Sequence, residues 1–290
     1  MALEMDAALL GPQVVDEPGT IVELTGRRAE PARPDLTVVV PSYHDGAAIR
    51  ENLDRLRRAL DSTGLEWEVV LVVDGDVDTY REALPCRGPR VRVLGYDSNR
   101  GKGFALRYGI SQARGELVTF IDSDMEIAPE EIGRMARLLD LYDADVVVGS
   151  KRHPLSEVEY PRLRRLQSLG YQLLIRALFR VRVRDTQTGL KLMRREVAER
   201  VLDVALVKRF AFDLELLAIA WCFGFRRIIE APVRIDYRFA STTNLRSVFW
   251  VLVDTLAIFY RLRLRRTYTR RSRQGMLALL STLPATLGPD

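Results

Sequence analysis

The sequence predicts an α/β protein in which helices cover both faces of a mostly parallel β-sheet. Short runs rich in Val, Ile and Leu alternate with stretches of helical periodicity over residues 36–150. This alternation is typical of parallel sheets, because each helix returns the chain to the edge where the next strand starts. With 290 residues, 47% of them hydrophobic, the chain can bury a core of this kind.

Five aliphatic runs in the first half are expected to form buried strands, since each is apolar along most of its length and ends at a polar or turn residue. Helices are expected between them, where apolar residues recur every three or four positions. The expected strands are Leu36–Ser42, Trp67–Asp74, Val91–Tyr96, Glu116–Asp122 and Ala144–Ser150, and the expected helices are Ala47–Leu60, Gly103–Ala113 and Glu130–Leu141.

The second half of the chain is richer in helices. We expect an amphipathic helix at Arg162–Phe179, an apolar helix at Phe212–Phe223, a returning strand at Arg226–Tyr237 and an apolar helix at Ser247–Arg266. Residues 1–34 lack periodicity and contain several Gly and Pro residues. The chain therefore divides into an extension (1–34), a main domain (35–246) and a C-terminal segment (247–290).

Polar residues gather where the expected strands end. PSYHD, DGDVD, DSD and GSKR follow the first, second, fourth and fifth strands. Such sheets bind ligands beyond the carboxyl ends of their strands, so we expect one site at this edge. Asp122 and Asp124 are spaced to bind a hard divalent cation and leave its other positions to phosphates, although Asp is also common in turns and helix caps.

A glycine-rich loop precedes the second expected helix. Gly101 and Gly103 flank Lys102, which offers flexible backbone and a cation to an anionic ligand, although an ordinary loop fits the same spacing. The Walker A and GxGxxG spacings are absent. With two His and two Cys residues, the sequence argues against a His-rich metal centre, a cysteine zinc site and a disulfide framework, and it favours a reducing cytoplasmic setting.

Seven segments in order carry a family resemblance: PSYHD, VVDGD, NRGKGFALRYG, FIDSDME, GSKR, DTQTGLKLM and FAFDLELL. Over about residues 36–246 the chain resembles glycosyltransferases of family 2, which adopt the GT-A (Rossmann-like) fold. It is similar to polyprenyl-phosphate sugar synthases, and most of all to the dolichyl-phosphate beta-glucosyltransferase branch. The resemblance implies an inverting, metal-dependent transfer from a nucleotide-sugar to polyprenyl phosphate with a β-linked product. UDP-glucose is the favoured donor, with GDP-mannose and UDP-N-acetylhexosamine left open.

The resemblance also implies roles for individual residues. Asp122 and Asp124 are implied to bind Mg²⁺ or Mn²⁺, and the catalytic groups are Asp124, Arg152 and Asp185. The acceptor phosphate is assigned to Arg152, Arg164 and Ser168, and the lining of the donor sugar and acceptor to Asp213 and Glu215. Residues implied to bind the donor are Pro41, Tyr43, Asp45, Asp74, Asp76, Lys102, Asp122, Ser123, Gln187 and Arg238. The family usually has Asn-Glu where this chain has His44-Asp45, so base selectivity stays open.

A phosphate acceptor suits these residues. The second pKa of a phosphate monoester is about 6, so the group is largely ionised at pH 7 and needs cations more than a general base. The alternative acceptor is a hydroxyl group of a polysaccharide or soluble molecule, for which Asp185 would serve as base. A structural capping role for Asp185 is the other interpretation.

The C-terminal segment predicts peripheral attachment to the cytoplasmic face of a membrane. Its aromatic, apolar helix runs into Arg261–Arg273, a stretch with seven Arg residues and no acid. Such a helix suits an anionic interface, and no apolar stretch reaches the roughly 18 residues that span a bilayer. A core helix with a solvated tail is the alternative. A nucleic-acid partner is not expected, because no nucleic-acid-binding motif accompanies the arginines. The intact DSD and DTQTG segments disfavour an inactive scaffold.

Overall fold

The computed structural model describes residues 33–156, 170, 175, 177–179, 183–207, 211–235, 245–265 and 267–268. In this part of the chain a seven-stranded sheet has the order β3-β2-β1-β4-β6-β5-β7. The strands are β1 (Leu36–Ser42), β2 (Trp67–Asp74), β3 (Val91–Tyr96), β4 (Leu117–Phe120), β5 (Val146–Ser150), β6 (Lys191–Arg194) and β7 (Ile228–Pro232). β6 is antiparallel to β4 and β5, and the other described pairs are parallel. The predicted mostly parallel α/β sheet is confirmed.

The strand predictions hold best for the first three strands, one of which, β3, lies at the edge of the sheet. β1, β2 and β3 have the predicted bounds, because each is mostly apolar and ends at a polar residue or loop. β4 stops at Phe120, before the predicted end at Asp122, because the chain leaves the sheet there to form the turn that carries the acidic residues. β6 was not predicted, since it has four residues and begins with a charge.

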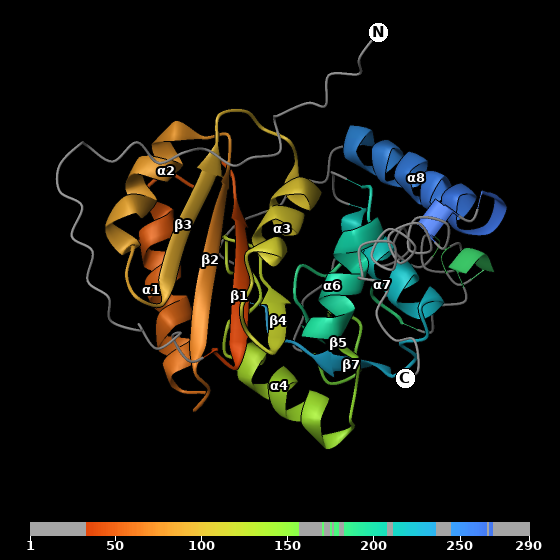
Figure 1. The fold of residues 1–290 in the computed structure, drawn as a ribbon, viewed down its shortest axis with the longest axis horizontal. Helices are drawn as coiled ribbons and strands as arrows, with labels where there is room; N and C mark the ends of the chain where they lie inside the picture. Colours follow the sequence, from red (N-terminus) through yellow and green to blue (C-terminus); the bar gives the residue numbers. More distant parts are fainter. Residues whose placement is uncertain are drawn as a thin grey trace, which may run out of the picture. The chain divides into compact units, whose positions relative to one another are not determined.

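Helices cover both faces of the sheet (Figure 1). α1, α2 and α4 pack on one face, against alternate residues such as Val38 and Leu71. α3, α6 and α7 pack on the other, against residues such as Val39 and Phe120. Their bounds are α1 (Ala48–Asp61), α2 (Val77–Ala83), α3 (Lys102–Ser111), α4 (Glu131–Leu141), α6 (Arg195–Val204), α7 (Phe212–Cys222) and α8 (Leu245–Phe259), with a 3-10 turn η2 (Leu84–Cys86) and a π-helical turn η3 (Tyr260–Leu264). Most of the helix expected at Arg162–Phe179 lies outside the described residues.

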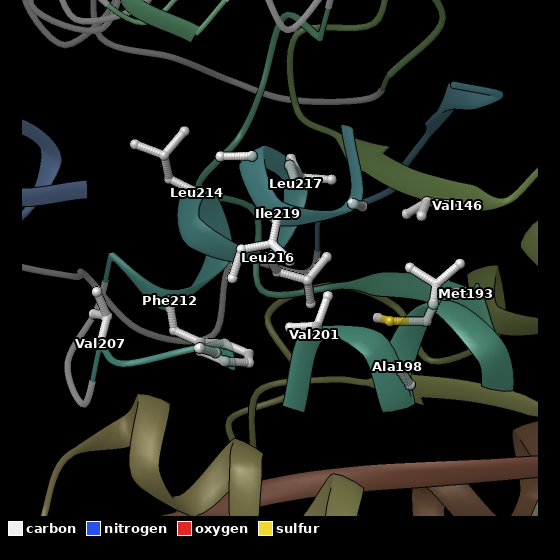
Figure 2. Close-up of a cluster of buried hydrophobic side chains, with 14 of the residues drawn as sticks. Val146, Met193, Ala198, Val201, Val207, Phe212, Leu214, Leu216, Leu217 and Ile219 are labelled. Atoms are coloured by element: carbon white, nitrogen blue, oxygen red, sulfur yellow. The ribbon is translucent and has the colours of Figure 1, made fainter. Parts of the chain in front are cut away.

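One of the two large apolar clusters joins the sheet to α6 and α7. Figure 2 shows Val146 and Met193 of the sheet, Ala198 and Val201 of α6, and Leu216 of α7 within this cluster. Residues Phe212 to Ala220 of α7 are all buried, which explains why this helix is apolar around most of its circumference. The cluster therefore fixes the start of α7 beside the carboxyl edge of β4.

One side of the C-terminal helix α8 packs against the rest of the protein. Thr255 and Ile258 are fully buried, and the ring of Phe259 meets that of Phe179 edge-on with centroids 6.1 Å apart. The helices that the structure describes include none with the length and apolarity needed to cross a membrane.

Candidate active site

A cavity of about 670 Å³ lies at the carboxyl ends of β1, β2 and β4, at the edge predicted from the strand-end residues. It brings together eight predicted site residues from three strand ends and the start of α3. These are Pro41, Tyr43, Asp45, Asp74, Lys102, Asp122, Ser123 and Asp124. Ser42, Asn99, Arg100, Gly101 and Ala105 also line the cavity. Of these five, Gly101 was expected beside an anionic ligand. The other four were not predicted as ligand contacts, although all lie in or next to the predicted motifs.

Asp74 holds the glycine-rich loop in place. Its two carboxylate oxygens accept hydrogen bonds from the backbone N–H groups of Arg100 (2.6 Å) and Gly101 (2.9 Å). Gly75 has a φ of +71°, and a Cβ there would lie 2.2 Å from the backbone nitrogen of Asn99, so the loop needs glycine at this position. The loop thus delivers the N-terminus of α3, with its partial positive charge, to the cavity.

Lys102 lies between two carboxylates. Its Nζ is 2.5 Å from Oδ1 of Asp122 and 4.0 Å from Oδ2 of Asp213. Burial alone would lower the pKa of Lys102, but Asp122 and Asp213 outweigh it and hold the pKa above its ordinary value. Lys102 is therefore a fixed positive charge on the wall of the cavity.

The negative charge of Asp124, the second acid of the DSD turn, is less well neutralised by neighbouring groups than that of Asp122. Asp124 is exposed, and its Oδ1 accepts the backbone N–H of Glu126 at 3.0 Å. Loss of hydration at the cavity wall, and then repulsion from Asp122, raise the pKa of Asp124. Two carboxylates that repel each other at the mouth of a cavity are stabilised by a bound cation.

Asp122 fits against the backbone of Gly189. A Cβ at position 189 would lie 2.0 Å from Oδ2 of Asp122 and 2.5 Å from its Cγ. Gly189 and Leu190 lie directly before the antiparallel strand β6. Because β6 runs opposite to β4, the start of β6 lies at the same edge of the sheet as the end of β4. Gly189 lies in the motif DTQTGLKLM, but its contact with Asp122 cannot be predicted from that motif, because the contact depends on the reversed direction of β6.

The DSD turn suits a divalent cation that is shared with a phosphate ligand. The described residues contain no group of three or more His, Cys, Asp or Glu side chains placed to bind a metal ion. Asp122 and Asp124 line the cavity together, and Mg²⁺ or Mn²⁺ bound by one or two carboxylates takes its remaining oxygens from phosphates and water. The residue set therefore fits a metal ion bound together with a diphosphate.

Asp76, which is predicted to contact the donor, has a structural role in this fold. It caps α2, accepting the backbone N–H of Thr79 at 3.3 Å and a hydrogen bond from the Thr79 hydroxyl, and it accepts the backbone N–H of His44 at 3.2 Å. The Thr79 hydroxyl, more than any other neighbour, lowers the pKa of Asp76. Asp76 is not among the residues that line the cavity.

Glu215 also departs from its predicted place. It is fully buried, and its carboxylate accepts hydrogen bonds from the backbone N–H groups of Leu206 (3.1 Å) and Val207 (2.8 Å) and from the hydroxyl of Tyr268 (2.6 Å). Burial raises the pKa of Glu215, although these hydrogen bonds oppose the shift. Asp213 and Glu215 are two residues apart on α7 and so point in different directions. Asp213 reaches Lys102, whereas Glu215 anchors the chain near its C-terminal helices.

Asp185 ties two loops together. Its carboxylate accepts the backbone N–H groups of Lys151 (3.1 Å) and Gln187 (3.2 Å), and its own N–H donates to Glu230 at 3.2 Å. These hydrogen bonds fit a structural role for Asp185, which was the alternative to its role as a catalytic base. Arg152 follows Lys151 in the turn after β5. Asp185, Gln187 and Arg152 do not line the described cavity. Arg164, Ser168 and Arg238 lie outside the described residues.

Comparison with known proteins identifies the family of this chain. Residues 37–202 match glycosyl transferase family 2. The dolichyl-phosphate beta-glucosyltransferase of Mus musculus is 31% identical over 246 residues, covering 79% of this chain and 75% of that protein. Glycosyltransferase AglD of Haloferax volcanii is 27% identical over 243 residues, covering 82% of this chain and 39% of that protein.

Solved structures show the same fold. Glucosyl-3-phosphoglycerate synthase from Mycobacterium tuberculosis, in complex with Mn²⁺, UDP and phosphoglyceric acid, superposes with a TM-score of 0.61 at 20% identity, covering 79% of this chain and 78% of that chain. The matched region of this chain contains the β1, β2 and β4 ends that form the cavity. The chain belongs to glycosyl transferase family 2, adopts the GT-A fold and is a glycosyltransferase.

Proposed function

We propose that this glycosyltransferase moves a sugar, glucose from UDP-glucose in the first instance, onto polyprenyl phosphate with inversion of configuration. The observation that carries the proposal is the cavity in which Asp122 and Asp124 face the start of α3 and Lys102. Relatives named dolichyl-phosphate beta-glucosyltransferase, similar over more than three quarters of this chain, support the choice of donor and acceptor.

The nucleotide diphosphate fits the positive side of this cavity. The N-terminus of α3 and the ammonium group of Lys102 supply positive charge, and Asp122 and Asp124 supply the ligands for Mg²⁺ or Mn²⁺. The metal ion, when bound, neutralises charge on the departing diphosphate. Pro41, Tyr43 and Asp45 line the cavity at the end of β1, and in this proposal they border the nucleotide base.

The acceptor fits the side of the site that follows β5. A phosphate monoester is already largely ionised at pH 7, so the transfer requires placement by cations more than removal of a proton. Lys151 and Arg152 lie in the turn after β5, and Nζ of Lys151 is 3.1 Å from Glu126, two residues beyond Asp124. The engagement of Asp185 with two backbone N–H groups argues for a positioning role in place of a general base.

A membrane surface fits the exposed side of α8 and η3. Val253, Leu256, Tyr260 and Leu264 are exposed by 37%, 55%, 46% and 69%, and their spacing of three or four residues places them in one stripe. We call these four residues the apolar stripe. Arg263 and Arg265 are exposed beside it. Apolar side chains flanked by arginines suit an interface with anionic headgroups, where each Arg contributes about 1 kcal/mol. The free thiols of Cys86 and Cys222 suit the cytoplasmic face.

The reaction is tested by incubating purified protein and Mn²⁺ or Mg²⁺ with polyprenyl phosphate and each of UDP-glucose, UDP-N-acetylglucosamine and GDP-mannose. Lipid-linked product is followed by mass spectrometry. We expect product from UDP-glucose, loss of product with Asp124→Asn, and full activity with Asp140→Asn, which removes an exposed carboxylate on α4. Product formed from another donor in place of UDP-glucose would mean that the transferred sugar is not glucose. Transfer to a hydroxyl acceptor, with none to polyprenyl phosphate, would refute the proposed acceptor.

A further inference from the structure

A row of alternating charges runs from the cavity into the core of the protein. Its members are, in order, Asp122, Lys102, Asp213 and Lys191. Nζ of Lys102 is 2.5 Å from Asp122 and 4.0 Å from Asp213, and Nζ of Lys191 is 2.5 Å from Asp213. The outer pair belongs to the proposed metal site, but Asp213 and Lys191 lie behind it, with 2% and 0% exposure.

Lys191 fixes the inner end of the row. Its ammonium group donates to the backbone carbonyl of Thr188 at 2.6 Å and to Oδ1 of Asp213 at 2.5 Å, and it lies 5.5 Å from the centre of the Phe120 ring. A charged group is buried at high cost unless it is paired, so Lys191 and Asp213 require each other. Asp213 is therefore held with Oδ1 toward Lys191 and Oδ2 toward Lys102.

The ammonium group of Lys102 contacts the carboxylate of Asp122, and the carboxylate of Asp213 lies close by. Nζ of Lys102 forms a close ion pair with Oδ1 of Asp122 at 2.5 Å, whereas the 4.0 Å separation from Oδ2 of Asp213 is longer than a hydrogen bond. A divalent cation on Asp122 would compete for the same oxygen and repel the ammonium group. A movement of about 1 Å toward Asp213 would then give Lys102 a normal charge-assisted hydrogen bond.

We propose that Asp213, held by Lys191, is a positioning residue that receives Lys102 when a divalent cation binds Asp122. This inference rests on the metal site of the proposed function and extends it. Lys102 neutralises Asp122 while the cation is absent, and Asp213 draws Lys102 away when the cation arrives. Asp213 thereby raises the affinity of the site for the cation without contacting it.

The test is a titration of the full chain with Mn²⁺ alone, in which free Mn²⁺ is measured by electron paramagnetic resonance. Asp213→Asn is compared in two backgrounds, the unchanged chain and Lys102→Met. With Lys102 present, we expect Asp213→Asn to weaken Mn²⁺ binding about tenfold, because Lys102 stays on Asp122. In the Lys102→Met background the same change should weaken binding less than about twofold.

A matched control removes another buried, paired carboxylate. Asp145 is 8% exposed and bonds Arg227 through its side chain, so Asp145→Asn tests for a general loss of packing. We expect it to leave Mn²⁺ affinity unchanged. Equal weakening by Asp213→Asn in both backgrounds, as through-space attraction alone produces, would overturn the inference and leave the proposed function intact.

Two further outcomes are decisive. If Asp213→Asn does not fold, Lys102→Met alone is the test, and Mn²⁺ should bind about tenfold more tightly once the competing ammonium group is gone. Unchanged or weaker binding by Lys102→Met would overturn the inference. Failure of the unchanged chain to bind Mn²⁺ would refute the metal site of the proposed function and, with it, this inference.

Discussion

The carboxylate of Asp122 lies against the α-carbon of Gly189, so closely that a Cβ at position 189 would be 2.0 Å from Oδ2. Gly189→Ala must therefore displace Asp122 from Lys102 and from the cavity. We expect kcat/KM to fall at least about 100-fold, or roughly 2.7 kcal/mol of transition-state stabilisation. Steady-state kinetics at several Mn²⁺ concentrations measures the effect. Stability should change little, since the side chain of Asp122 is 41% exposed and its displaced carboxylate can be hydrated.

Gly88→Ala is the matched control for this change. A Cβ at Gly88 would meet no atom within 4 Å, and its backbone does not lie in the left-handed region. We expect its kinetics to equal those of the unchanged chain. Full activity of Gly189→Ala would mean that Asp122 can function from another position.

Asp74→Ala should weaken donor binding by releasing the loop before α3. The backbone N–H groups of Arg100 and Gly101 would lose their acceptor, which costs about 1–3 kcal/mol of stability, and Lys102 would lose its fixed position. We expect the KM for the nucleotide-sugar to rise about tenfold, with a matching loss in UDP binding by calorimetry. Asp76→Ala removes the neighbouring N-cap and should cost about 1 kcal/mol of stability with no change in KM.

The strand-end residues of this site were predictable because buried parallel strands are continuous apolar runs. Val38–Val40 and Val69–Val73 show no polar interruption, so the segment PSYHD and Asp74 stand out at the points where the runs stop. The role of Lys191 was not predictable in this way. It depends on an antiparallel strand of four residues, and nothing in the local pattern KLMR shows the direction of that strand.

Glu215 was misplaced for a different reason. The motif FDLELL presents two acids, but a helix turns about 100° per residue, so residues two apart do not share a face. The short helix α2 was missed because most of its residues are polar and it has only seven of them. α6 has a visible apolar spacing at Val197, Ala198, Val201 and Val204, which sequence analysis did not use.

Tyr268→Phe should destabilise the fold without changing catalysis. It removes the hydroxyl that donates to Glu215 at 2.6 Å and leaves a buried carboxylate with one partner fewer. We expect the free energy of unfolding in urea to fall by about 1–3 kcal/mol, with kcat and donor KM within twofold. A tenfold loss of kcat at unchanged stability would show that Glu215 contributes to the active site after all.

Glu68 should make the stability of the fold sensitive to acid. Burial alone would raise the pKa of Glu68, but hydrogen bonds from Arg114 and Thr37 and the charge of Arg92 hold the pKa below its usual value. The stabilisation is therefore present above the ordinary Glu pKa and is lost as the pH falls through the lower folded-state value. Glu68→Gln should cost about 1–3 kcal/mol at pH 7 and progressively less below about pH 4 in urea unfolding.

Glu66→Gln is the control for Glu68, because it removes a carboxylate two residues away that is exposed and paired with the exposed Arg90. We expect it to change stability by less than about 1 kcal/mol at either pH. An equal pH dependence of the two variants would show that the buried network around Glu68 does not set acid sensitivity.

The apolar stripe should govern attachment to lipid. Leu256→Gln combined with Leu264→Gln removes two of its four members, and we expect at least about tenfold weaker sedimentation with vesicles that contain anionic lipid. Leu141→Gln is the control, since Leu141 is 74% exposed at the end of α4, away from the stripe. Equal vesicle binding by the double variant would show that the stripe does not face the membrane.

The reversed strand β6 makes the spacing of the segment before it critical. Lys191 and Met193 face the cluster that contains Phe120, whereas Leu190 and Leu192 face the opposite cluster under α1 and α4. One residue inserted or deleted between Asp185 and Lys191 would exchange the two faces of the strand. The ammonium group would then point into an aliphatic layer, and Asp213 would lose its counter-charge. The length of this short connection is thus as strict a requirement as the identity of any acid in the site.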